Sequence, residues 1–180
     1  MFYCFLADGF EETEALAPVD ILRRAGIEVK TVGVGGGVIR GSHNIYVTAD
    51  VDIADLGELS DAEGIILPGG MPGVKNLFAD DRVKDAVSYC VSNDLYICAI
   101  CAAPMILGRM GVVDGKRATC FPGFEDDLKG AEKTGEKVVT DGKVITAKGA
   151  GCALDFGFAI VTAVMGADKA EKIASSMQCR

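Results

Sequence analysis

The sequence contains no tryptophan, a single histidine and only five prolines among its 180 residues. It also has no long apolar run. A membrane-spanning helix needs roughly 20 consecutive apolar residues, so we expect no transmembrane segment and no membrane partner. The first residues lack a basic region followed by an apolar stretch and a small-residue cleavage site, which argues against a secretory signal. We therefore expect a cytoplasmic protein.

Positive charge is scarce as well. Lysine and arginine number 18 against 26 aspartates and glutamates, and the formal net charge is −8. Proteins that bind a nucleic-acid backbone need clustered Lys and Arg side chains. Because the sequence has no basic run, we expect no nucleic-acid partner.

The scarcity of histidine limits metal binding. A structural zinc site usually takes four Cys or His ligands, yet His43 is the only histidine and no second cysteine pair stands near Cys98 and Cys101. We therefore expect neither a metal nor a cofactor. The odd number of cysteines at irregular spacing is typical of free thiols in a reducing compartment. The seven cysteines are Cys4, Cys90, Cys98, Cys101, Cys120, Cys152 and Cys179.

Apolar residues make up 49% of the sequence, enough for a sizeable core. Short apolar runs alternate with amphipathic stretches, which is the pattern of βαβ units. The expected strands cover residues 2–7, 27–34, 45–48, 64–67, 95–100, 137–140 and 143–147. The expected helices cover residues 12–24, 81–91, 103–110, 154–164 and 169–177. We predict one α/β domain over residues 1–180, a three-layer α/β/α sandwich with a mostly parallel sheet.

The strongest chemical signal is the end of the strand at 95–100. The run stops at Cys101, two alanines follow, and Pro104 suits the first turn of a helix. This is the pattern of a nucleophile elbow, in which a tight turn exposes the side chain above the sheet. A thiol there lies at the positive end of a helix dipole, so we expect its thiolate to be favoured. The alternatives are a plain buried cysteine or a redox pair with Cys98, whose side chain should face the opposite side of the sheet.

The acid partner should come from the segment after the first strand, which contains Glu11, Glu12 and Glu14. Acidic residues are common in the first turn of a helix, so we expect at least two of the three to be ordinary surface charges. One that turns inward would have a raised pKa and stay protonated near neutrality, so it could donate a hydrogen bond to the thiolate and carry a proton during the reaction. Gly69 and Gly70, after another strand, either supply N–H groups to an oxyanion or form a plain turn.

Several segments together resemble the ThiJ/PfpI superfamily, in its DJ-one/YajL-like branch. They are residues 6–14 (LADGFEETE), 18–20 (PVD), 23–27 (RRAGI), 67–70 (LPGG), 99–104 (AICAAP), 149–151 (GAG) and 155–156 (DF). The resemblance implies a flavodoxin-like fold, similar to class I glutamine amidotransferases, and a homodimer. It places the family cysteine at Cys101 and the family glutamate at Glu14. It also places backbone donors at Gly69, Gly70 and Ala102.

The resemblance implies a glutathione-independent glyoxalase or deglycase that acts on methylglyoxal-type dicarbonyls through Cys101 and Glu14. The alternative is a non-enzymatic oxidative-stress sensor or chaperone that uses oxidation of Cys101. A peptidase is disfavoured, because Ala102 stands where the protease-like branch has histidine. His43 falls where relatives carry an arginine near the partner's site, and we regard it as either a residue of the pocket rim or an ordinary surface histidine.

Overall fold

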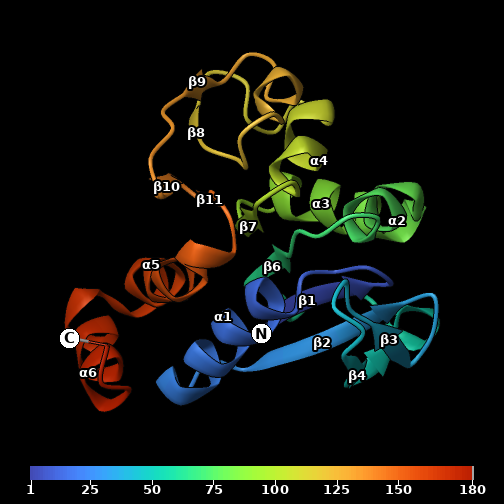
Figure 1. Cartoon of the computed structure of the whole chain (residues 1–180), viewed down its shortest axis with the longest axis horizontal. Coiled ribbons are helices and arrows are strands. Elements are labelled where there is room, and N and C mark those ends of the chain that lie inside the picture. The colour runs from blue at the N-terminus through green and yellow to red at the C-terminus, as the bar shows by residue number, and fades with distance from the viewer. Residues whose placement is uncertain (180) are drawn as a thin grey trace.

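The computed structural model describes residues 1–179, and its centre is a seven-stranded sheet in the order β10-β11-β7-β6-β1-β2-β5 (Figure 1). All neighbouring strands of this sheet are parallel except the β10–β11 hairpin. Its strands are β1 (Phe2–Ala7), β2 (Val29–Val34), β5 (Val51–Asp52), β6 (Gly64–Leu67), β7 (Tyr96–Ile100), β10 (Val138–Asp141) and β11 (Val144–Ala147). The two small sheets are β3 (Val38–Arg40) with β4 (Tyr46–Thr48), and β8 (Arg117–Ala118) with β9 (Glu132–Lys133).

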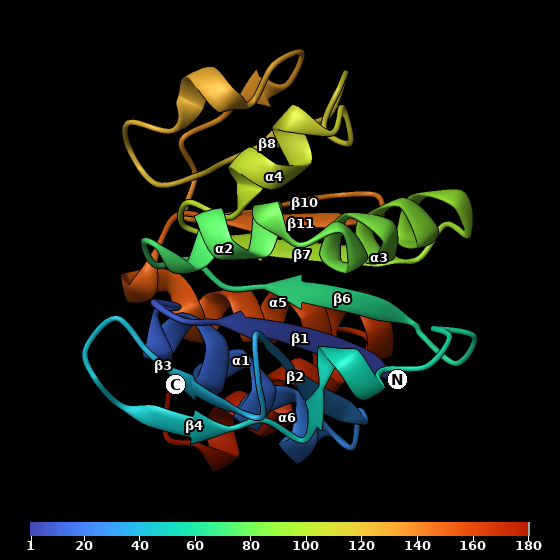
Figure 2. The same ribbon diagram turned by 90° about the vertical axis from the view of Figure 1, so that its right-hand side faces the viewer.

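Helices cover both faces of the sheet, as Figures 1 and 2 show. One face carries α1 (Glu12–Ala25), α5 (Ala153–Met165) and α6 (Ala167–Ser176). The other carries α2 (Gly73–Ala79), α3 (Asp81–Ser92) and α4 (Pro104–Arg109). Short 3-10 turns lie at Ile53–Asp55, Glu125–Asp127 and Ala150–Cys152. Each face has its own apolar core, so the predicted three-layer sandwich is confirmed. Among residues 1–179, no helix is both long and apolar enough to cross a membrane.

Local sequence explains where α1 begins and ends. The Glu11 carboxylate accepts the backbone N–H of Glu14 and caps the first turn. At the other end Gly26 adopts a φ of 85°, and the N–H of Ile27 donates to the Leu22 carbonyl. This is a Schellman motif, which needs a residue that tolerates positive φ. Because Ile27 belongs to this helix cap, β2 starts at Val29 rather than at residue 27 as predicted.

The sequence predicted the strand at 64–67 and the final hairpin with the bounds close to those observed. It missed the α2 helix, which has seven residues and no side-chain cap. It also missed the short strands β3, β5, β8 and β9. Strands of two or three residues are too short to show a period of two, so only tertiary pairing defines them.

The parallel strands bring three distant segments together. In the register of the sheet Cys4 pairs with Ile66, and Leu67 pairs with Ala99. The chain leaving β1, β6 and β7 therefore emerges at one edge. The segments that follow these strands contain the predicted acid, the paired glycines and the predicted nucleophile, and the carboxyl edge of such a sheet is where ligands bind in α/β folds.

Candidate active site

Cys101 occupies a sharp turn between β7 and α4. It has a φ of 66°, a left-handed conformation that is unfavourable for any residue with a Cβ. Two backbone hydrogen bonds hold the turn: the Cys101 N–H donates to Ala147 O at 2.8 Å, and the Phe121 N–H donates to Cys101 O at 2.8 Å. Pro104 takes the first helical position of α4, as predicted. The predicted elbow geometry is therefore present.

The environment of Cys101 differs from that of the other cysteines. Cys101 is partly buried and touches both apolar cores. Cys98 is fully buried in the core beneath α1 and α5, and burial raises its pKa well above the ordinary value. Both thiols are free. Cys101 is therefore partly accessible, whereas Cys98 is enclosed in the core.

Glu14 meets the Cys101 sulfur. Its side chain comes from the first turn of α1, is 1% exposed, and forms a hydrogen bond with the thiol. The Gly69 N–H donates to Glu14 Oε2 at 2.9 Å, and the Ala150 N–H donates to the same carboxylate. Three separate segments therefore position one carboxyl group against the sulfur.

Glycine is required at both positions of the Gly69–Gly70 turn. A Cβ at position 69 would lie 3.0 Å from the sulfur of Cys101 and would overlap the Glu14 carboxylate. Gly70 has a φ of 91°, and a side chain there would run into the backbone of residues 9–11. Close approach of backbone to a reactive pair is a common use of glycine.

Two backbone N–H groups point at the sulfur, those of Gly70 and Ala102. These are two of the three donors that the resemblance implied. The third, Gly69, donates instead to Glu14. The donors thus divide between sulfur and carboxylate.

The acid–base properties differ in part from the expectation. Burial raises the pKa of Glu14 from 4.5 to about 7, which confirms the predicted direction. The expectation of a favoured thiolate is wrong. Burial, and then the neighbouring Glu14 carboxylate, raise the pKa of the Cys101 thiol to about 12, although the two amides act in the opposite sense. The pair therefore loses its first proton near neutrality, and Glu14 is the group that loses it.

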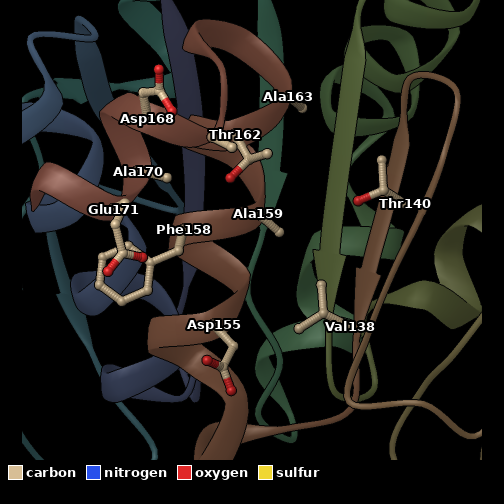
Figure 3. Close-up of a pocket in the computed structure, with 11 residues that line it drawn as sticks. Val138, Thr140, Asp155, Phe158, Ala159, Thr162, Ala163, Asp168, Ala170 and Glu171 are labelled. Atoms are coloured by element: carbon tan, nitrogen blue, oxygen red, sulfur yellow. The ribbon is translucent and has the colours of Figure 1, made fainter. Parts of the chain in front are cut away.

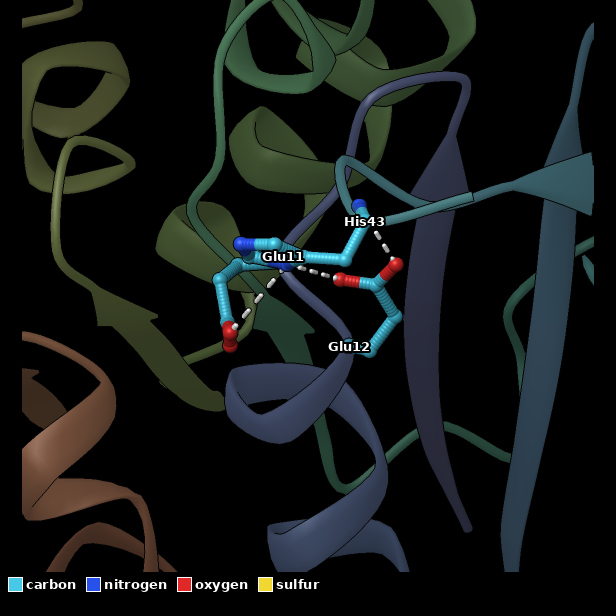
Figure 4. Close-up of side chains that lie close together, drawn as sticks. All are labelled: Glu11, Glu12 and His43. Atoms are coloured by element: carbon cyan, nitrogen blue, oxygen red, sulfur yellow. Dashed lines mark hydrogen bonds and ion pairs between the residues drawn. The ribbon is translucent and has the colours of Figure 1, made fainter. Parts of the chain in front are cut away.

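The predicted surface glutamates are a second correction. Glu12 is only 6% exposed and Glu11 is half-buried. Glu12 accepts the His43 backbone N–H at 2.7 Å, and its other oxygen lies 2.8 Å from His43 Nδ1 (Figure 4). These contacts lower the pKa of Glu12 to about 2, against the opposing effect of burial. Glu12 thus anchors the loop after β3.

His43 itself is exposed and bound to Glu12, and that contact raises its pKa. Its Nδ1 lies 4.0 Å from Glu11 Oε1, and Glu11 in turn caps the turn that carries Glu14. The ligand atoms of Glu11, Glu12 and His43 lie within 4.8 Å of one another, close enough to hold a metal ion. The hydrogen bonds to Glu12 already account for their arrangement. His43 therefore stands beside the first turn of α1, and its place at a pocket rim stays a prediction.

Sequence reasoning missed two contributors. Ala150 binds Glu14 through its N–H, and the Phe121 ring lies against Gly149 beside Glu14. The segment 149–151 belongs to the family resemblance and was associated with the pocket wall, without a hydrogen bond to Glu14. Phe121 was noted only as a point of likeness to the YajL-like members, without a place beside Glu14.

A separate cavity of about 550 Å³ lies between β10 and the helices α5 and α6 (Figure 3). Its walls include Val138, Phe158 and Asp168. None of its lining residues is Cys101, Glu14 or Phe121. The reactive pair therefore lies outside this cavity.

Comparisons with known proteins agree with this geometry. The DJ-1/PfpI family matches the chain over residues 2–163. A "Parkinson disease protein 7 homolog" of Danio rerio is 34% identical over 172 residues, which are 93% of this chain and 91% of the relative. A Pyrococcus abyssi protein named a deglycase is 29% identical over 144 residues, 79% of this chain and 86% of that one.

Solved structures are similar over almost the whole chain. Oxidized DJ-1 of Toxoplasma gondii superposes with a TM-score of 0.94 at 28% identity, covering 98% of this chain and 97% of that one. DJ-1beta of Drosophila melanogaster gives 0.92 at 33% identity, covering 98% and 96%. The fold is therefore the flavodoxin-like fold that the motifs implied. With the family match spanning most of its length, this chain belongs to the DJ-1/PfpI family.

Proposed function

We propose that this protein converts small α-oxoaldehydes such as methylglyoxal into 2-hydroxy acids without glutathione, with Cys101 as nucleophile and Glu14 as proton carrier. The observation that carries the proposal is the hydrogen-bonded Cys101–Glu14 pair at the carboxyl edge of the sheet. A nucleophile within hydrogen-bonding reach of a base is the arrangement that covalent catalysis requires.

In the first step the sulfur attacks the aldehyde carbon while Glu14 takes the thiol proton. An S–C bond forms, and the carbonyl oxygen becomes an alkoxide that receives the same proton from Glu14. The product is a hemithioacetal. The N–H groups of Gly70 and Ala102 already point at the sulfur, so they are suited to hold the oxygen on the adjacent carbon.

In the second step Glu14, again ionised, removes the hydrogen of the former aldehyde carbon as a proton, which leaves an enediolate. The hydroxyl proton passes from the oxygen of that carbon to the former ketone oxygen, and Glu14 returns its own proton to the neighbouring carbon. The former ketone carbon then bears a hydroxyl group, and the hemithioacetal has become a thioester. Water then cleaves the thioester, which releases lactate from methylglyoxal and restores the thiol. Since the pKa of Glu14 is about 7, kcat/KM should rise as pH increases through neutrality and this group ionises.

The test is lactate formation from methylglyoxal in the absence of glutathione. Wild type and Cys179→Ser, which changes the exposed cysteine, should both be active. Cys101→Ser and Glu14→Gln should lose at least about a hundredfold of kcat/KM, since covalent and general-base catalysis are both removed. Turnover at the wild-type rate in Cys101→Ser would refute the proposal.

A deglycase activity would use the same pair on adducts of methylglyoxal with thiols or amines. The Pyrococcus relative carries that name. The two activities differ in the step that limits the loss of adduct. If the enzyme consumes only free methylglyoxal, the adduct must first dissociate by itself, so at saturating enzyme it disappears no faster than this spontaneous dissociation. Adduct loss faster than that rate would identify a deglycase.

The second candidate is a cytoplasmic oxidative-stress sensor or chaperone. It is favoured by the partial exposure of Cys101, whose sulfur has two amide donors ready to bind the oxygens of an oxidised thiol. Treatment with one to a few equivalents of peroxide should add two oxygens at Cys101. Selective oxidation without any dicarbonyl turnover would favour this role, and failure to oxidise Cys101 ahead of Cys179 would exclude it.

We also propose that the chain forms a homodimer, as the resemblance implied. The β3–β4 hairpin exposes Val38 (59%), Ile45 (54%) and Tyr46 (66%) beside the first turn of α1. Exposed apolar side chains gathered on one hairpin mark a contact surface. Sedimentation equilibrium of wild type and Tyr46→Asp tests this. A monomeric wild type would contradict it.

A further inference from the structure

Phe121 is a large apolar side chain that remains exposed, with 46% of its surface accessible. It is not part of either core cluster. Exposure of nearly half of this side chain is unfavourable, because fully burying a phenylalanine is worth about 1.5–3 kcal/mol. A partly exposed ring beside Cys101 and Glu14 is therefore a candidate contact for a ligand.

Its position relative to the pair is well defined. The Phe121 N–H donates to the carbonyl of Cys101 itself at 2.8 Å. A Cβ at position 149 would lie 3.2 Å from Cδ2 of Phe121 and 3.9 Å from Oε1 of Glu14. The phenyl ring and the catalytic carboxylate thus border the same small space, and the absence of a side chain at Gly149 keeps that space open.

The backbone that carries the ring is held on both sides. Besides the Phe121 N–H bond to Cys101 O, the Phe121 carbonyl accepts the Phe124 N–H at 3.1 Å. The next residues close a turn in which the Gly123 N–H donates to Glu125 Oε2 at 2.7 Å. A ring on a main chain that is already ordered costs less entropy to position against a ligand than one on a mobile loop.

We propose that Phe121 is a specificity-determining residue, whose ring forms an apolar wall of the substrate site and favours α-oxoaldehydes with an aromatic substituent over methylglyoxal. The inference rests on the proposed function for its reaction, and it names the substrate class. An aryl group attached to the reacting carbonyl would lie against the phenyl ring while the aldehyde carbon meets the sulfur. Offset or edge-to-face ring contacts stabilise such a complex beyond simple area burial.

The first measurement is the ratio of kcat/KM for phenylglyoxal to that for methylglyoxal. We expect this ratio to fall about three- to tenfold in Phe121→Ala, the range that aromatic pair energies allow. Phe121→Tyr, which keeps a ring, should retain the wild-type ratio. Tyr89→Ala serves as the matched control, because Tyr89 is a partly exposed ring on α3.

The second measurement does not depend on turnover. The Cys101 thiol displaces bromide from 2-bromoacetophenone or from bromoacetone: an S–C bond forms, the C–Br bond breaks, and the proton passes to Glu14 or water. The quantity measured is the alkylation rate with 2-bromoacetophenone divided by the rate with bromoacetone. Dividing it by the same ratio for glutathione removes the difference in intrinsic reactivity and leaves the contribution of the Phe121 ring. This corrected ratio should exceed one in wild type and fall toward one in Phe121→Ala.

The outcomes separate the two proposals. If wild type turns over no dicarbonyl but the alkylation ratio falls in Phe121→Ala, the proposed reaction is wrong and the aromatic wall stands. If Phe121→Ala keeps the wild-type alkylation ratio, the wall is refuted, whether or not the enzyme turns over methylglyoxal. A thermal melt of Phe121→Ala close to that of wild type confirms that folding is not the cause.

Discussion

Replacing Glu14 by glutamine should change the pH dependence of stability by an amount that the structure defines. The native state holds this carboxyl at a pKa of about 7, against an ordinary value of 4.5, because burial disfavours its charge. Because the native pKa of Glu14 is raised, the protonated carboxyl group adds its full contribution to stability below the unfolded pKa. This contribution to the free energy of unfolding is lost as pH rises through the native pKa. Buried charge at Glu14 therefore destabilises the protein at alkaline pH.

The magnitude follows from the pKa gap. One pKa unit corresponds to about 1.4 kcal/mol. Integrated from pH 5 to pH 8, the shift of Glu14 removes about 2 to 3 kcal/mol from the free energy of unfolding. Glu14→Gln cannot ionise, so this loss disappears. The new amide group binds the backbone N–H groups of Gly69 and Ala150 less well than a carboxylate does, which lowers the free energy of unfolding. This loss is the same at every pH, because the amide does not ionise.

The assay is urea unfolding of wild type and Glu14→Gln at pH 5 and pH 8, at one protein concentration. The quantity of interest is the change in free energy of unfolding between the two pH values, compared between variants. Contributions from His43 and Glu12 are present in both proteins and cancel in the comparison. Equal pH dependence in the two variants would show that Glu14 ionises in the folded protein as it does in the unfolded chain, and the assignment of Glu14 as a base near neutrality would fail.

Three further predictions concern neighbouring positions. Gly69→Ala should abolish most activity and lower stability by about 1–3 kcal/mol, because the new Cβ overlaps Glu14 and the sulfur; unchanged kinetics would contradict the geometry of the turn. Cys101→Gly should be about 1 kcal/mol more stable than Cys101→Ala in thermal unfolding, since glycine adopts the φ of 66° without strain; the reverse order would mean that the elbow is not strained. Glu12→Gln should lower stability by about 1–3 kcal/mol at pH 7, because it weakens the anchor of His43. The contribution of Glu12 is present above pH 4.5 and lost as pH falls toward its native pKa of about 2, so wild type and variant should converge in acid, and a constant gap would argue against an ionised anchor.

Much of the architecture could be predicted from the sequence because its signals are local. The apolar runs of β1 and β6, the periodic face of α1 and the Asp-Gly hairpin turn each depend on residues close together in the chain. The elbow at Cys101 could be recognised for the same reason, since a strand, small residues and Pro104 stand side by side. The short helix α2 and the small strands carry no such local signal.

The chemistry of the site depended on distances that no local pattern contains. The choice of Glu14 over Glu12 as partner of the sulfur came from a family resemblance, while the burial of both emerged only in the fold. The direction of the thiol pKa was predicted wrongly because the prediction left out desolvation of the sulfur and took the adjacent carboxyl group as a protonated hydrogen-bond donor. Ala150 and Phe121 joined the site from distant segments.

What the sequence by itself determined is the order of strands and helices, the elbow cysteine and the glycine turn, because short-range sterics and periodicity decide them. What only the tertiary structure decided is which groups face the sulfur, how far each is buried, and which N–H serves which acceptor. Electrostatic and hydrogen-bonding energies depend on separation and solvent exposure in space, and these are set when segments far apart in the sequence, such as those of Glu14 and Ala150, pack at one edge of the sheet.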